Sequence, residues 1–149
     1  MRRPSLSGVI ARSTPRAVLF GVISAAFVAL AYGILSEPLE LTLGLLAIAF
    51  FGGWLIGNAI SYGAWSGQAH DTYQPFQWLA LALSLVAWAS ALILAFAVSQ
   101  AFIPQSSLPL VQRLTVDGFF TYLSGLEFVP VIHVISLALL AFMAWRGAR

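Results

Sequence analysis

Long runs of apolar residues alternate with short polar segments along the chain. The runs lie at about 17–35, 41–62, 78–98 and 128–145, and none of them contains Asp, Glu, Lys or Arg. A bilayer core is about 30 Å thick and a helix rises about 1.5 Å per residue, so about 20 apolar residues cross it. The pattern therefore predicts an all-α membrane protein, with residues 1–149 forming a single domain of four transmembrane helices.

Two of the polar segments predict turns at the membrane surface. Residues 36–40 hold a proline between two glutamates, and a tight hairpin is expected there because proline ends a helix and carboxylates need water. Residues 63–77 hold glycine, proline, His70 and Asp71 beside Trp and Tyr residues, which favour the headgroup region. This second segment is expected to be an interfacial loop.

The third polar segment, residues 99–127, is long enough to hold structure of its own. Leu108, Val111 and Leu114 recur near helical spacing, with polar residues opposite them. This spacing predicts a short interfacial helix between spans three and four, lying along the membrane surface.

Composition supports the membrane assignment and excludes other classes. Hydrophobic residues make up 60% of the chain and charged residues 8%, far fewer charges than a soluble domain carries. Intrinsic disorder requires low hydrophobicity, and nucleic-acid binding requires a denser basic surface than seven arginines provide, so no nucleic-acid partner is expected. The absence of cysteine excludes thiol redox chemistry and cysteine-ligated metals.

The distribution of arginine predicts the orientation. Six of the seven arginines lie before the first span or after the last, at positions 2, 3, 12, 16, 146 and 149. With four spans the two ends share one side of the membrane, and arginine-rich segments stay in the cytoplasm. Both termini are therefore expected to be cytoplasmic, in the inner (plasma) membrane.

Small residues spaced four apart predict how the helices pack, because small side chains let the backbones of membrane helices approach closely. Such spacing occurs in three of the spans, and the second contains a Gly-x-x-x-Gly motif. The expected helix-packing residues are Gly21, Gly33, Gly53, Gly57, Ala91 and Ala95. The fourth span has no comparable spacing and is expected to fill grooves or face lipid.

His133 is the ionisable side chain expected inside the hydrocarbon, and intramembrane ionisable residues often mark function. The alternative is a structural role, with a neutral imidazole bonded to a backbone carbonyl or to the hydroxyl of Ser136 or Ser90. Asn58 is a third intramembrane polar candidate, expected to bond between helices. His70 belongs to the opposite side of the membrane, so a bis-histidine haem is disfavoured and no metal site is predicted.

The stretch from Gly52 to Gly67 is dense in small residues, aromatics and polar groups. Trp54, Tyr62 and Trp65 are candidates for a pocket that receives a flat hydrophobic ligand or a lipid headgroup. A bound lipid or lipophilic pigment is therefore an open alternative to plain packing, and no cofactor is predicted.

No complete catalytic set is present, because no span holds a carboxylate and no serine has an activated arrangement beside a base. The chain is therefore predicted to be a non-catalytic accessory or scaffolding subunit of a larger membrane complex, of respiratory or photosynthetic type. The alternatives are a small homo-oligomeric carrier or channel with His133 along its path, or a binder of a lipid-soluble ligand. The expected partners are membrane lipids and either other subunits or further copies of the chain.

Overall fold

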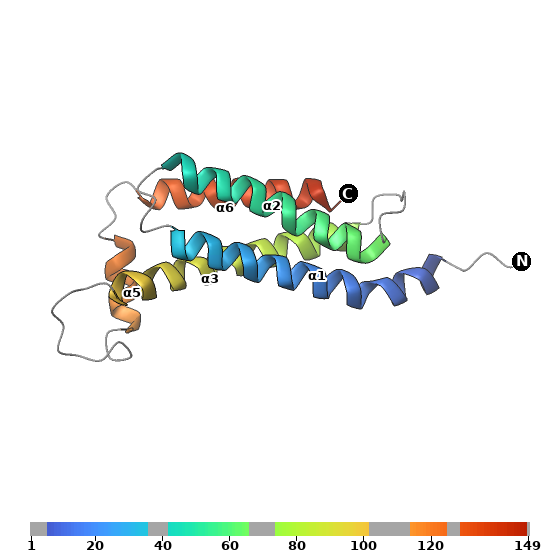
Figure 1. The fold of residues 1–149 in the computed structure, drawn as a ribbon, viewed down its shortest axis with the longest axis horizontal. Coiled ribbons are helices and arrows are strands. Elements are labelled where there is room, and N and C mark those ends of the chain that lie inside the picture. Colours follow the sequence, from blue (N-terminus) through green and yellow to red (C-terminus); the bar gives the residue numbers. More distant parts are fainter. Residues whose placement is uncertain (1–5, 36–41, 66–73, 102–113, 125–128, 149) are drawn as a thin grey trace, which may run out of the picture.

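The computed structural model describes residues 6–35, 42–65, 74–101, 114–124 and 129–148. All regular structure within these ranges is helical, as the apolar pattern predicts (Figure 1). The helices are α1 (Leu6–Leu35), α2 (Thr42–Trp65), α3 (Gln74–Ala101), α5 (Val116–Ser124) and α6 (Val129–Gly147).

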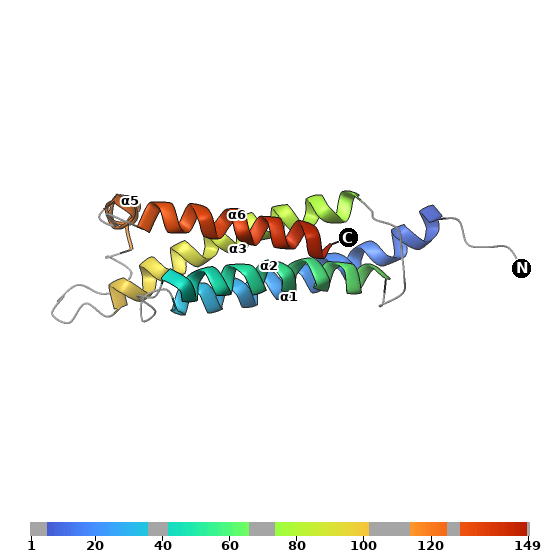
Figure 2. The same ribbon diagram turned by 90° about the horizontal axis from the view of Figure 1, so that it is seen from above.

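The four long helices lie side by side and α5 lies across one end of them (Figures 1 and 2). α1 packs on α2 and α3, and α6 packs on the same two helices, so α1 and α6 are diagonally opposite in the bundle. The start of α1 and the end of α6 lie at the same end, away from α5 (Figure 1). We call this the open end of the bundle.

Within the described residues, three helices are long and apolar enough to cross a membrane, which confirms three of the predicted spans in length and composition. They are Thr14–Leu35, Leu43–Trp65 and Gln74–Ala101. The fourth predicted span, 128–145, corresponds to a shorter apolar helix, Val131–Gly147. At about 1.5 Å per residue its 17 residues reach about 26 Å, slightly less than a typical hydrocarbon core.

The helices extend beyond the predicted spans, and the interfacial loop predicted over 63–77 was wrong at both of its ends. α2 continues to Trp65 and α3 already begins at Gln74. Pro75 lies in the first turn of α3, where the missing N–H has no helical acceptor to lose. Hydropathy marks where the hydrocarbon ends, whereas helical backbone hydrogen bonding continues into the headgroup region. The helices are therefore longer than the apolar segments.

A short helix, α5, lies between α3 and α6 in the described part of the chain, and of the three positions whose spacing predicted an interfacial helix only Leu114 is described, just before α5. Leu114 and Thr115 precede it, and the Thr115 hydroxyl accepts a hydrogen bond of 3.0 Å from the Gly118 N–H, which caps the helix start. Phe119 and Tyr122 of this helix pack on Phe96 of α3, with ring centroids 5.6 Å apart in each pair. The predicted positions 108 and 111, the hairpin at 36–40 and His70 lie outside the described residues.

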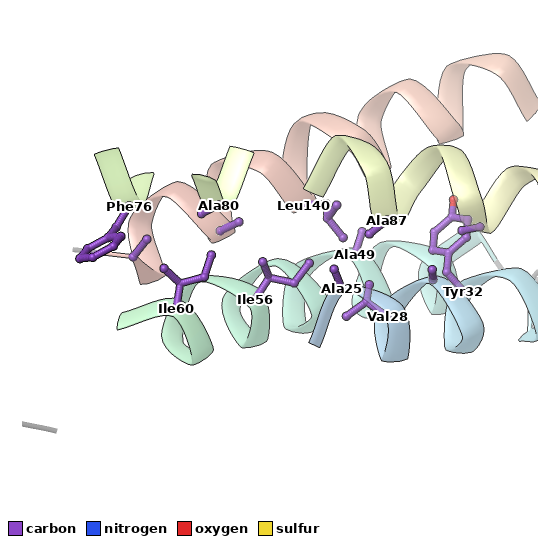
Figure 3. Packing of buried hydrophobic residues seen from close by; sticks show 14 of the residues in the cluster. Ala25, Val28, Tyr32, Ala49, Ile56, Ile60, Phe76, Ala80, Ala87 and Leu140 are labelled. Carbon is purple, nitrogen blue, oxygen red and sulfur yellow. The ribbon is translucent and has the colours of Figure 1, made fainter. Parts of the chain in front are cut away.

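The core between the long helices is built mainly from small side chains (Figure 3). The spaced small residues of α1 are all buried, namely Ala17, Gly21, Ala25, Ala29 and Gly33. Larger core residues such as Ile56, Ile60 and Leu140 fill the spaces between them. Many of the largest apolar side chains face outward instead, as Phe27 and Phe51 do. Since lipid is as apolar as leucine, membrane helices gain most from close backbone approach, and this core follows that rule.

Candidate functional site

His133 is buried near the start of α6, with 7% of its surface exposed. Its Nδ1 atom lies 2.8 Å from the hydroxyl oxygen of Tyr32 on α1. In the tautomer that carries its proton on Nε2, the Tyr32 O–H donates this hydrogen bond. Because α1 and α6 are diagonally opposite, the length of the tyrosine side chain is what lets the bond cross the bundle.

A second hydrogen bond reaches the backbone of the same residue. The indole Nε1–H of Trp88 on α3 donates to the His133 carbonyl oxygen over 3.1 Å. A carbonyl oxygen has two lone pairs, so it accepts this bond in addition to a helical one. His133 therefore connects α6 to both α1 and α3 at one depth in the bundle.

Ser136 lies one turn after His133 and is fully buried. Its hydroxyl is close to that of Tyr32, but the Ser136 hydroxyl forms no hydrogen bond of acceptable geometry with any group in the described part of the chain. It borders a small cavity of about 10 Å³ that Tyr32, Ala87 and Trp88 also line. This volume is close to the minimum that one water molecule needs.

The structural alternative for His133 offered a backbone carbonyl or the hydroxyl of Ser136 or Ser90 as its partner, and the structure places the hydroxyl of Tyr32 there instead. Ser136 does not bond the imidazole, and Ser90 is exposed on the outward side of α3. Asn58 donates from Nδ2 to the Trp54 carbonyl of its own helix at 2.8 Å, rather than bonding a second helix. His133 and Ser136 therefore lie beside the same two residues, Tyr32 and Trp88, whereas Asn58 bonds within its own helix.

The cluster around His133 is suited to joining helices. In the described ranges, no group of three or more His, Asp or Glu side chains is arranged to hold a metal ion. Asp117, the one acidic residue in those ranges, is exposed on α5. The polar contacts that His133 makes are the hydrogen bonds to Tyr32 and Trp88, which fix the positions of three helices relative to one another.

The glycines predicted to mediate packing lie where helices touch. A Cβ atom on Gly53 would collide with the carbonyl oxygen of Leu140, and one on Gly57 with that of Ala144. A Cβ on Gly21 would lie 2.7 Å from Ile60, and one on Gly33 would lie 2.9 Å from the carbonyl oxygen of Ala91. Ala91 and Ala95 are themselves buried.

The three aromatic residues predicted to form a pocket have three different neighbours. Tyr62 makes an edge contact with Phe20 of α1, and Trp65 makes one with Phe76 of α3, each with centroids 6.0 Å apart. Trp54 instead lines a groove of about 530 Å³ between α2 and α6. The structure does not bring these rings together.

Sequence reasoning missed Tyr32, Trp88 and the groove beside α6. Tyr32 lies close to the end of the first apolar run and His133 close to the start of the fourth, so matching their depths would have paired them. The groove depends on which faces of α2 and α6 turn outward, for which the sequence carries no comparable signal. No protein-family model, curated protein or solved structure matches the chain.

Proposed function

We propose that the chain is a non-catalytic accessory or scaffolding subunit of a larger complex in the inner membrane, of respiratory or photosynthetic type. It crosses the bilayer four times, with both termini in the cytoplasm. The arginines at the two ends support this orientation, and the length of α6 is sufficient if the bilayer thins slightly around it. The observation that carries the proposal is the surroundings of Ser90.

Ser90 lies near the middle of α3 with its hydroxyl on the outward surface of the bundle. Elsewhere on this helix Ser84 donates to the Ala80 carbonyl and Ser99 donates to the Phe96 carbonyl, both over 2.8 Å. Ser90 makes no such bond to any described group. A hydroxyl without a partner is unfavourable in hydrocarbon, so its place is better explained by a second protein that accepts its hydrogen bond.

The neighbours of Ser90 form a face that fits another helix. Ala82, Val86, Ala89 and Ile93 are exposed on the same side of α3, and their spacing of three, four and seven residues keeps them in line. The two alanines allow close backbone approach, and the branched residues beside them supply contact area. We call these five residues the outward face of α3.

The arrangement of the interior also supports a role without catalysis. His133 is engaged with Tyr32 and Trp88, and Asn58 is engaged with its own helix. The bonds of His133 hold helices in place, and side chains engaged in this way leave little for proton transfer or nucleophilic attack.

Photo-crosslinking from the outward face tests the proposal. The chain has no cysteine, so Ser90→Cys introduces one thiol, which a benzophenone maleimide labels in native membranes. Ile23→Cys, on the exposed side of α1, is the matched control. We expect illumination to join the Ser90→Cys variant to an identified, unrelated membrane protein at fixed stoichiometry, and the control to lipid.

Two other outcomes would overturn the proposal. An adduct at twice the chain mass of 16.0 kDa would show a second copy on the outward face, which favours the homo-oligomeric carrier or channel. Adducts with lipid alone in both variants would show that the outward face of α3 meets only the bilayer.

A further inference from the structure

The groove between α2 and α6 changes from apolar to polar along its length. Its residues are Phe50, Phe51, Trp54, Asn58, Met143, Arg146 and Gly147. Phe50 precedes Asn58 by eight residues, which places them about 12 Å apart along α2. Phe51 and Trp54 are exposed, so the groove opens on the lipid-facing surface of the bundle.

The polar part of the groove lies at the level expected for headgroups. Arg146 is in the last turn of α6, at the open end of the bundle (Figure 1). The adjacent residue, Trp145, makes an edge contact with Trp78 near the start of α3, with centroids 5.4 Å apart. Tryptophan collects at the boundary between lipid and water, so this pair marks that boundary.

Arg146 is suited to bind an anion. Its side chain is exposed and forms no ion pair in the described part of the chain, whose one acidic residue, Asp117, lies at the other end of the bundle (Figure 1). Asn58 beside it uses one amide N–H on the Trp54 carbonyl, which leaves its second amide N–H for a ligand. A guanidinium binds phosphate through two parallel N–H bonds.

We propose that this groove binds an anionic phospholipid. The headgroup phosphate contacts Arg146 and Asn58, and one acyl chain lies over Phe50, Phe51 and Met143. The order of polar and apolar lining residues matches the order of groups in a phospholipid. A transmembrane helix from a partner would place its own apolar surface against the guanidinium, so the lining favours lipid. Basic pockets between helices on the cytoplasmic side characteristically hold such headgroups.

Native mass spectrometry of the purified full chain tests the site, with phosphatidylglycerol and phosphatidylcholine of identical acyl chains as probes. We expect phosphatidylglycerol to bind about fivefold more tightly, the ratio that about 1 kcal/mol from one arginine produces. Arg146→Gln should abolish this preference. Arg16→Gln should preserve it, because Arg16 is exposed at the same end of the bundle but outside the groove.

Equal binding of the two lipids would overturn the proposal. An equal loss in Arg146→Gln and Arg16→Gln would also overturn it, because that result indicates general attraction to a basic surface. Binding of inorganic phosphate alone, with no gain from the acyl chain, would show an anion site without a lipid site.

Fluorescence provides a second readout in bilayers, where Arg146→Gln is compared with the parent chain. Phosphatidylglycerol brominated in its acyl chain is added at low fraction to phosphatidylcholine, and Trp54 is the tryptophan in the groove. We expect Trp54→Phe to remove the quenching that depends on Arg146. Unchanged quenching in Trp54→Phe would place the lipid elsewhere.

Discussion

The contact between α2 and α6 and the contacts around His133 hold the same helix, α6, in two different ways. Along α2, Gly53 and Gly57 bring the backbone of α6 so near that no side chain fits between them. Around His133, the backbones of α1 and α6 stay apart, and the aromatic side chain of Tyr32 reaches across with a polar tip. The packing of α6 thus depends on the absence of side chains beside α2 and on a long side chain beside α1.

The two regions should respond differently to substitution. Backbone atoms cannot move aside as a side chain does, so an added side chain at the glycine contact displaces a whole helix. A side-chain hydrogen bond inside a membrane protein contributes on average only about 0.6 kcal/mol, because the unfolded state in lipid also finds partners. We therefore expect the larger losses at the glycines.

Gly57→Leu should have the largest effect. The added side chain meets the Ala144 carbonyl, and we expect the free energy of unfolding to fall by about 3 kcal/mol or more. Denaturation in mixed micelles measures this loss. Ala47→Leu, which adds a similar side chain on the exposed side of the same helix, should change stability by less than about 0.5 kcal/mol. Equal losses in the two variants would remove the distinction between the regions.

Tyr32→Phe and His133→Leu should have an intermediate effect. Each removes one partner of the 2.8 Å hydrogen bond, and the double-mutant cycle isolates their interaction. We expect a coupling free energy between about 0.6 kcal/mol, the average for such bonds in membranes, and about 1.7 kcal/mol, the largest found. A coupling of zero would mean that Tyr32 and His133 stabilise the bundle independently. Assembly should survive both variants, whereas a carrier that uses the imidazole would lose its pH dependence in His133→Leu.

Ser136→Ala should have the smallest effect. The Ser136 hydroxyl has no hydrogen-bond partner in the described ranges, so its removal costs no bond, and stability should change by less than about 0.5 kcal/mol. The same denaturation assay measures it. A loss of about 1.5 kcal/mol or more would show that the hydroxyl binds a water in the adjacent cavity and belongs to the cluster around His133.

The features of the fold that follow from composition and spacing were predictable. A helix in contact with lipid must be apolar along its length, so the sequence predicts the three long spans and the all-helical class. The spacing of four that includes Gly53 and Gly57 identifies positions where the structure brings helices together. The helix ends at Leu6 and Gln74 did not follow from hydropathy, because helical hydrogen bonding continues where lipid stops.

The candidate sites were less predictable, because they depend on how each helix is rotated about its axis. His133 was identified as a buried polar residue, but its partner on α1 depends on the diagonal placement of α1 and α6. Trp54 and Arg146 are far apart in sequence and line one groove because α2 and α6 pack closely through glycine. Both cases require the three-dimensional arrangement of the helices.

Native mass determination after gentle extraction of the tagged chain from its own membrane tests the proposed role most directly. We expect identified, unrelated membrane proteins to remain bound at fixed stoichiometry, and Ser90→Leu on the outward face of α3 to release them while the bundle stays folded. A pure assembly of 16.0 kDa chains, unchanged by that substitution, would contradict the accessory-subunit role.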